Sequence, residues 1–230
     1  MPRREVDTIV VVIPAHNEES NIARALAGVR RAIVPLARSV DVEVVVVVNG
    51  GIDRTAEIVR QEGAHLLVSD IADVGAARST GCRWALLRFA SRLDRLWIAT
   101  TDADSLVPRH WLAEHLGAAE GGADVVLGTV VLAPHEARRH RGWAETYAQD
   151  AARRRHHGHV HGANMGIRAR RYLEVGGFRA MAAREDVDLV ERLRSASARI
   201  AWLSHVPVLT SARHDNRVVA GVGNDLAASM

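Results

Sequence analysis

Short apolar runs alternate with segments of helical periodicity along the first two-thirds of the chain. The runs are rich in β-branched residues, which favour strands, and the intervening segments repeat apolar residues every three or four positions, as amphipathic helices do. We expect strands at residues 8–13, 42–48, 65–69 and 95–100. This alternation is typical of a mostly parallel sheet. The valine run at 42–48 is nearly continuous, which predicts a strand covered by helices on both faces.

Polar residues mark where the helices between these strands begin. Ser20 is a candidate cap for a first helix, and Asp53 for a short helix that ends at Gly63. We expect a third helix from about 75 to 92, and a fourth that Pro108 opens in its first turn. The predicted fold class is therefore α/β, with a Rossmann-like, mostly parallel sheet flanked by helices.

The pattern changes after a further apolar run at 124–132. Arginine, histidine and glutamate then crowd a stretch with weak helical periodicity, which predicts a helical insertion or lid at 134–161. Beyond it we expect a return to the sheet at 161–168, a helix at 185–196 and two short strands at 200–203 and 206–210. No linker divides the chain, so we expect one domain over residues 1–215 and a loose tail at 216–230.

Composition narrows the class of protein. The chain has 230 residues, of which 48% are hydrophobic, enough for a substantial core. Its longest apolar runs are too short to span a bilayer, and no apolar leader opens the sequence, so we expect a cytoplasmic protein without a transmembrane segment. The single cysteine, Cys82, excludes an internal disulfide and fits a reducing compartment.

Arginine supplies all 30 basic residues, because the sequence contains no lysine. Schiff-base chemistry and the lysine-dependent phosphate loop are therefore excluded, and phosphate must be bound by arginine, metal or backbone groups. A net charge of +3 and an aromatic content of 4% argue against a nucleic-acid partner. Peripheral membrane contact through the arginines stays open.

Two carboxylates, Asp102 and Asp104, directly follow the predicted strand at 95–100. If the backbone stays extended there, residues i and i+2 project to one side and address one target together. Mg²⁺ or Mn²⁺ is a natural target, since both prefer carboxylate and phosphate oxygens. The alternative is a solvated turn, where aspartate is common. Placement at a strand's carboxyl end favours the ligand site, because open α/β sheets bind ligands there.

An ordered set of motifs resembles glycosyltransferase family 2, of the GT-A type. Its members here are residues 10–19, Asn49 to Thr55, the Asp102 and Asp104 pair, and Glu185 with Asp186. Further similarity lies in 75–78, 162–168 and 175–178. The resemblance implies transfer of a sugar from a nucleotide-diphosphate donor to a hydroxyl acceptor, with inversion at the anomeric carbon and with Mg²⁺ or Mn²⁺ as cofactor.

The resemblance also implies which residues contact the nucleotide-sugar. These candidates are Pro14, Ala15, Asn17, Glu18, Asn49, Asp53, Arg78, Asp102, Ala103 and Asp104. We expect a uridine-linked donor. Similar proteins carry an acidic pair where this chain has Val48 and Asn49, and loss of that carboxylate leaves uridine versus another base open. Each of three candidates also has a structural alternative to nucleotide binding. Glu18 could stabilise the first turn of a helix by its charge, Asp53 could cap a helix, and Arg78 could form a surface salt bridge.

Roles within the predicted reaction follow from motif position. The resemblance assigns Asp104 to metal coordination, Asp102 to the ribose or a metal-bound water, and His214 as a candidate third metal ligand. We expect Asp186 to be the general base, with Glu185 as an orienting or acceptor-binding carboxylate. The alternative for this last pair is stabilisation of a helix dipole.

Two other functions stay open from the sequence alone. One is a sugar-phosphate nucleotidyltransferase, which shares the sheet type but usually relies on a glycine-rich phosphate loop. The other is a nucleotide-sugar-binding protein without catalysis, motivated by the altered residues Val48 and Asn49. The acceptor cannot be read from any motif.

Overall fold

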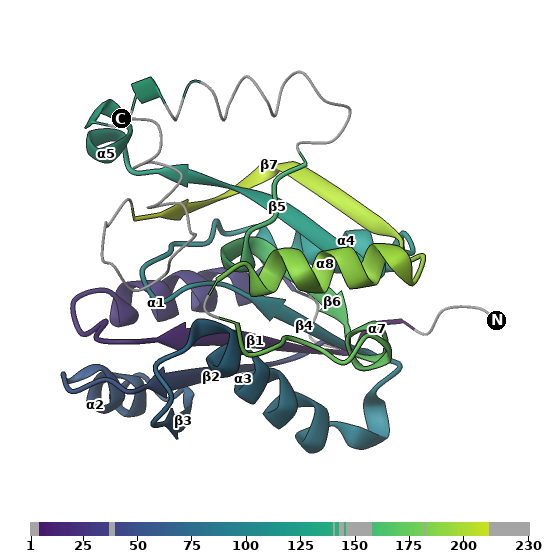
Figure 1. Cartoon of the computed structure of the whole chain (residues 1–230), viewed down its shortest axis with the longest axis horizontal. Coiled ribbons are helices and arrows are strands. Elements are labelled where there is room, and N and C mark those ends of the chain that lie inside the picture. Colours follow the sequence, from purple (N-terminus) through teal and green to yellow (C-terminus); the bar gives the residue numbers. More distant parts are fainter. Residues whose placement is uncertain are drawn as a thin grey trace.

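The computed structural model describes residues 5–36, 40–139, 141–142, 145, 158–181 and 183–211. Seven strands in these ranges form one sheet, in the order β3-β2-β1-β4-β6-β5-β7 (Figure 1). The predicted α/β class is confirmed. The predicted tail at 216–230 lies outside the described residues, as does part of the predicted lid at 134–161. Of the lid, α5 (Pro134–Arg139) and residues 141–142, 145 and 158–161 are described.

One half of the sheet is parallel and follows the predicted strands closely. It contains β1 (Thr8–Ala15), β2 (Asp41–Asn49), β3 (His65–Ser69) and β4 (Leu96–Thr100). β2 and β4 pair with β1 on either side, and β3 pairs with β2, all in parallel. The carboxyl ends of β1, β2 and β4 therefore meet at one edge of the sheet.

The other half contains β5 (Val125–Leu132), β6 (Met165–Arg168) and β7 (Ile200–Thr210). β6 lies antiparallel between β4 and β5, whereas β7 runs parallel to β5. The prediction of two short strands at 200–203 and 206–210 was wrong. One strand continues through both, because a register shift opposite Gly128 to Val130 absorbs the irregularity.

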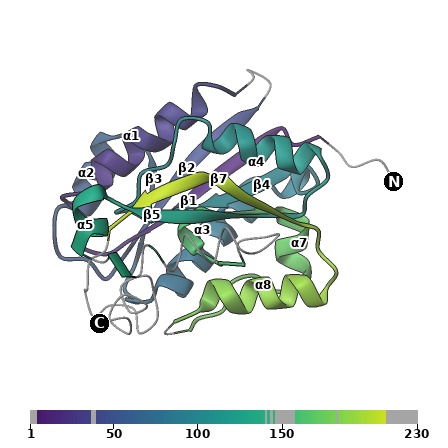
Figure 2. The same cartoon turned by 90° about the horizontal axis from the view of Figure 1, so that it is seen from above.

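Helices cover both faces of the sheet (Figure 2). One face carries α1 (Ile22–Ile33), α2 (Thr55–Gln61) and α4 (Trp111–Glu120). The opposite face carries α3 (Val74–Arg88), α7 (Ala169–Glu174) and α8 (Glu185–Ser195). Two 3₁₀ turns, Ala90–Arg92 and Gly162–Asn164, follow α3 and precede β6.

β1 shows how the two cores arise. Its side chains alternate between the faces: Ile9, Val11 and Ile13 pack with α1 and α4, while Val10 and Val12 pack toward α3. All five are fully buried. An apolar run without polar alternation is therefore the signature of a strand covered on both sides, as predicted.

Three helix boundaries differ from the predictions. α1 begins at Ile22 after an Asn21 cap, so Ser20 is not its cap. α4 begins at Trp111, because the backbone first turns so that the N–H of Trp111 meets the carbonyl of Pro108 at 3.0 Å. The helix expected at about 75–92 is α3 followed by a separate 3₁₀ turn. Across the described residues, none of the helices combines the length and apolarity needed to span a membrane.

Candidate active site

A pocket of about 300 Å³ opens at the carboxyl ends of β1, β2 and β4. This is the edge where open α/β sheets bind ligands. The residues that line it come from the ends of β1 and β2, from the loops after β1, β3 and β4, and from the start of α3. They are Pro14, Ala15, His16, Glu18, Asn49, Ala72, Val74, Asp102, Ala103 and Asp104. Seven of the ten predicted nucleotide-contacting residues therefore lie together; Asn17, Asp53 and Arg78 do not line the pocket.

The loops after β1 and β2 are tied to each other. His16 Nδ1 lies 2.5 Å from the carbonyl oxygen of Asn49, so the two pocket residues hold one another in place. Asn17 adopts a left-handed backbone conformation with φ of 53°, and its Oδ1 accepts a hydrogen bond from the N–H of Ile52 at 2.9 Å. The side chain of Asn17 thus fixes the loop instead of facing the pocket.

Asp53 has a similar structural role at the start of α2. Its Oδ1 accepts hydrogen bonds from the N–H and the hydroxyl of Thr55, at 2.9 and 2.6 Å, and its Oδ2 accepts one from the N–H of Glu19 at 3.0 Å. These hydrogen bonds lower the pKa of Asp53, although burial, the largest single influence, acts in the opposite direction. The structure therefore places Asp53 as a brace between two loops.

Glu18 is buried at the pocket wall. Its carboxylate accepts a hydrogen bond from Asn21 Nδ2 at 2.9 Å, and its N–H donates to Thr55 Oγ1 at 2.7 Å. Because α1 begins at Ile22, Glu18 does not lie in a first helical turn. The alternative role as simple helix charge was therefore wrong for this residue.

Asp102 and Asp104 are both partly exposed and both line the pocket. The backbone does not stay extended beyond Thr100. It turns at Ala103 and Asp104, and the N–H of Ser105 closes the turn on the carbonyl of Asp102 at 3.1 Å. The expected extended geometry was wrong, yet the turn still presents both carboxylates to one pocket.

Arg78 joins this carboxylate pair to the opposite wall of the site. It is only 4% exposed, its Nη2 lies 2.5 Å from Asp102 Oδ1, and its Nη1 pairs with the carboxylate of Glu185. Burial acts to lower the pKa of Arg78, but Asp102 and Glu185 together raise it, so the guanidinium stays charged. The surface salt bridge expected as the plainer alternative is wrong, because Arg78 forms a buried bridge between two motifs, while its contact with phosphate stays a prediction.

Glu185 and Asp186 begin α8 but differ in access. Glu185 is 3% exposed, and burial raises its pKa, although Arg78 acts in the opposite direction. Asp186 is partly exposed, and its Oδ2 accepts a hydrogen bond from the N–H of Gly162 at 2.8 Å. Both lie in the first helical turn, so they also stabilise the helix dipole. Of the two, Asp186 can meet a substrate.

Gly162 contacts both sides of the site, the end of β4 and the start of α8. Its carbonyl accepts a hydrogen bond from Thr100 Oγ1 at 2.6 Å. A Cβ added to it would lie 2.5 Å from the guanidinium carbon of Arg78, so only glycine fits against that side chain. The turn after the lid region is thereby fastened to β4, to Arg78 and to Asp186.

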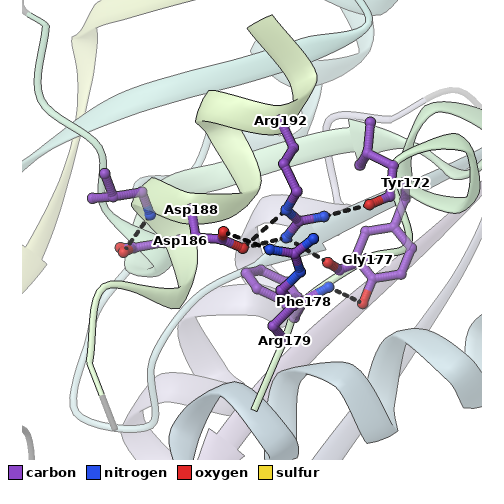
Figure 3. A network of polar contacts seen from close by, with 9 residues as sticks. Tyr172, Gly177, Phe178, Arg179, Asp186, Asp188 and Arg192 are labelled. Atoms are coloured by element: carbon purple, nitrogen blue, oxygen red, sulfur yellow. Dashed lines mark hydrogen bonds and ion pairs between the residues drawn. The ribbon is translucent and has the colours of Figure 1, made fainter. Parts of the chain in front are cut away.

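A second polar network holds α8 in this position (Figure 3). Asp188 pairs with Arg192 at 2.5 Å and with Arg179 at 3.2 Å, and Arg192 donates to the carbonyl of Gly177 at 2.8 Å. The Tyr172 hydroxyl accepts a hydrogen bond from the N–H of the residue after Gly177 at 2.9 Å. The 175–179 loop is therefore clamped to α7 and α8.

Sequence reasoning did not identify three lining residues, His16, Ala72 and Val74. His16 stands within the motif that was recognised, between Ala15 and Asn17, so its position was the available signal. Ala72 lies in the loop between β3 and α3, and Val74 is the first residue of α3; both side chains are apolar and gave no chemical signal. Only the sheet topology brings that loop to the pocket.

The carboxylates of Asp102 and Asp104 are oxygen donors of the kind that Mg²⁺ and Mn²⁺ prefer. Within the described ranges, however, no three His, Cys, Asp or Glu side chains come close enough to hold a metal on their own. The candidate third ligand, His214, lies outside the described residues. The donor set fits a cation that takes its remaining ligands from a bound diphosphate and water.

The sequence model of glycosyl transferase family 2 matches residues 10–175, which is most of the chain. The chain belongs to this family. This membership agrees with the resemblance that its motifs suggested. The matched range spans the β1 loop, the Asp102 and Asp104 turn and the Gly162 turn, and ends before α8.

Relatives and solved structures agree on the family's fold. A dolichyl-phosphate hexose transferase from Haloferax volcanii is 34% identical over 122 residues, which are 53% of this chain and 47% of that protein. The chain thus spans about half the length of this curated relative.

A Pyrobaculum calidifontis mannosyltransferase, solved with GDP-Man and Mn²⁺, has a TM-score of 0.65 at 19% identity, over 92% of this chain and 59% of its own. For S. aureus TarS 1-349, solved with UDP-GlcNAc, the TM-score is 0.67 at 17% identity, over 96% and 66%. At these identities the two structures show the GT-A fold.

Proposed function

We propose that the chain transfers a sugar from a nucleoside diphosphate donor, a UDP-sugar by preference, to an acceptor hydroxyl, with inversion at the anomeric carbon and with help from Mg²⁺ or Mn²⁺. The observation that carries this proposal is the buried Arg78 bridge. It places Asp102, on the wall of the pocket, and Glu185, the neighbour of Asp186, on the two sides of one guanidinium. A donor-side carboxylate and a candidate base therefore belong to one site.

The 300 Å³ pocket is the proposed donor site. Glu18 and Asn49 supply polar groups for the base and ribose, while Pro14 and Ala15 supply a surface for the base. The uridine preference is supported by TarS, solved with UDP-GlcNAc, and by a Mycobacterium tuberculosis glucosyl-3-phosphoglycerate synthase, solved with Mn²⁺ and UDP, at a TM-score of 0.55. The mannosyltransferase solved with GDP-Man makes a GDP-sugar the first comparison to test.

A divalent cation would be held by Asp104, with Asp102 on a metal-bound water or the ribose. A bound cation would neutralise the negative charge that develops on the diphosphate as the sugar leaves. Asp102 is held beside this site by its ion pair with Arg78. The chain has no lysine that could neutralise the diphosphate in place of the cation.

Asp186 is the proposed general base. An alcohol is a poor nucleophile at neutral pH, so a positioned carboxylate assists by accepting its proton. The acceptor oxygen forms a bond to the anomeric carbon, its proton passes to Asp186, and the bond from that carbon to the diphosphate breaks, with the electron pair leaving on the diphosphate. Glu185 is buried and paired, so its proposed role is to position Asp186 through Arg78.

The test measures release of nucleoside diphosphate from a panel of UDP- and GDP-sugars with Mn²⁺. We expect one donor to be turned over and Asp104→Asn to abolish its metal-dependent turnover. Asp186→Asn should keep nucleotide binding while turnover falls by roughly 10²- to 10⁴-fold, the usual contribution of a general base. Asp41→Asn is the matched control, because Asp41 is exposed at the opposite end of β2.

Three results would contradict the proposal. A folded chain that shows no thermal shift with any nucleotide lacks the donor site. Release of pyrophosphate from a nucleoside triphosphate would indicate a nucleotidyltransferase. Donor binding without turnover, unaffected by Asp186→Asn, would indicate a binding protein without catalysis.

A further inference from the structure

A second pocket, of about 280 Å³, lies along α8 beside Asp186. One wall is the segment 158–161, which leads into the Gly162 turn. The other wall is one face of α8 and the residue before it, contributed by Arg184, Val187, Val190, Glu191 and Arg194. None of the residues that line the first pocket takes part.

The residues on α8 are spaced to form a single stripe. Intervals of four and three positions, from Val187 through Glu191 to Arg194, put these side chains on one helical face. Arg184, which precedes the helix with φ of 62°, extends this stripe along the same pocket. Two other faces of α8 are already occupied: Leu189 and Leu193 enter the core, and the Asp188 and Arg192 pair clamps the 175–179 loop (Figure 3). Among the residues that the structure describes, this stripe is the face of α8 that lines the second pocket.

The charge of this stripe suits an anion. Arg184 and Arg194 are both exposed at its two ends, and Glu191 is the only acid among the residues that line the pocket. The guanidinium of Arg194 lies over the Trp202 ring at 5.3 Å, which holds it in place. Arginine presents several donors in a planar fork that matches phosphate or carboxylate oxygens.

The opposite wall adds hydrogen-bonding groups. His159 and His161 stack with their ring centroids 6.1 Å apart and their planes at 19°. His161 directly precedes Gly162, whose N–H binds Asp186 Oδ2, and Arg184 stands two residues before Asp186. A molecule held in this pocket therefore lies beside the proposed base.

We propose that this pocket binds a phosphate or carboxylate group on the acceptor, with Arg184 and Arg194 as the residues that hold it. The anion then orients the rest of the acceptor so that its hydroxyl reaches Asp186. This inference rests on the proposed function, because it names the substrate class that the site takes as acceptor.

The first experiment compares glycerol 3-phosphate with glycerol, which differ in the anionic group alone. Each is titrated by calorimetry into the full chain, once with saturating UDP and Mn²⁺ to occupy the donor pocket and once without them. We expect glycerol 3-phosphate to bind and glycerol not to bind. Arg184→Gln and Arg194→Gln should each weaken this binding about tenfold or more, as expected for loss of a charge-assisted hydrogen bond.

Arg60→Gln is the matched control, since it removes the same charge from an exposed position on α2. Arg184→Lys is a second variant that keeps the charge and should recover part of the affinity. Thermal unfolding of each variant checks that it is folded. Equal binding of glycerol and glycerol 3-phosphate, or affinities within twofold of the parent in both glutamine variants, would overturn the inference.

A second arm distinguishes a soluble anion from a lipid headgroup. Vesicles of phosphatidylglycerol are compared with vesicles of phosphatidylcholine in a sedimentation assay. If the anionic vesicles capture the chain, and Arg184→Gln and Arg194→Gln abolish this capture, the inference is supported and the anion belongs to a lipid. If the chain binds glycerol 3-phosphate but is not captured by vesicles, the inference is supported and the anion belongs to a soluble acceptor. If nucleotide binds normally but the arginines have no effect, this inference fails while the proposed function stands; if no nucleotide binds, the proposed function fails.

Discussion

The two walls of the site are built in different ways. The donor wall is made by the loops after β1 and β2, neighbouring parallel strands whose loops hydrogen bond directly to each other. The catalytic wall is the Gly162 turn with the start of α8, and it is fastened by Thr100, Arg78 and Asp186, which are far apart in the sequence. Hydrogen bonds between adjacent loops hold the donor wall together. Buried contacts between residues far apart in the sequence, including the charged pair of Arg78 and Glu185, hold the catalytic wall together.

This difference predicts where the molecule is fragile. Loops braced by several hydrogen bonds lose a little stability when one bond is removed, because the others remain. A buried charge that loses its partner is far more costly, because its desolvation is no longer offset. Substitutions on the catalytic wall should therefore affect stability more than substitutions on the donor wall.

Arg78→Met should give the largest effect. It leaves Glu185 buried without its guanidinium, and removing one partner of a buried pair costs about 3–5 kcal/mol. Urea unfolding of the variant and the parent measures this difference. The double variant Arg78→Met with Glu185→Leu should recover much of the loss, since it removes the stranded charge. A loss below about 1 kcal/mol in the single variant would mean that the bridge does not join the walls.

Gly162→Ala tests the close approach of the turn to Arg78. The added methyl group meets the guanidinium at 2.5 Å, and overpacking of this kind costs up to about 3 kcal/mol. Gly117→Ala is the control, because a Cβ there meets nothing within 4 Å and Gly117 is exposed on α4. That control should stabilise the chain by about 0.5–1 kcal/mol. Equal effects at both positions would show that the turn has room to move.

The far side of the same turn predicts a pH dependence. Asn164 accepts a hydrogen bond from Trp111 at 2.9 Å, and His115 packs between Trp111 and Trp97. Burial lowers the pKa of His115 to about 3, although Asn164 acts in the opposite direction. The unfolded chain takes up this proton below a pH of about 6.5 while the folded chain does not, so stability is lost as the pH falls from about 6.5 toward 3.

His115→Gln measures the size of this contribution. It removes the titrating ring and keeps an acceptor for the Trp97 indole N–H, which lies 3.4 Å from His115 Nδ1. Between pH 7 and pH 5 the parent should lose about 2 kcal/mol more than the variant, from the linkage of one depressed pKa. Parallel losses in the two proteins would contradict a neutral, buried His115.

The same contrast explains what the sequence could predict. The four parallel strands and their carboxyl-end loops followed from apolar periodicity, because each βα unit is formed by residues near one another in the chain. The family resemblance named Pro14, Glu18 and Asn49, and the place of Asp104 after a predicted strand marked it as a ligand candidate; all four line one pocket.

The catalytic wall could not be derived in this way. The bridge from Arg78 to Glu185 spans 107 positions, and no local pattern distinguishes a buried arginine from a surface one in a chain with this many arginines. The continuity of β7 depends on a register shift against β5, which periodicity does not encode. Long-range packing decided both, so only the structure reveals them.

Asp53→Ala tests the donor wall and should have the smallest effect. It removes the hydrogen bonds from Asp53 to Thr55 and to the N–H of Glu19, at the start of α2. Loss of the carboxylate that accepts these hydrogen bonds costs about 1 kcal/mol, and the hydrogen bonds between Asn17 and Ile52 and between Glu18 and Thr55 still join the loops. Urea unfolding measures the loss, and Asp53→Asn, which keeps an acceptor oxygen, should recover part of it. If Asp53→Ala lowers the free energy of unfolding as much as Arg78→Met does, the two walls are equally sensitive to substitution. The remaining hydrogen bonds between the loops would then not compensate for the lost ones.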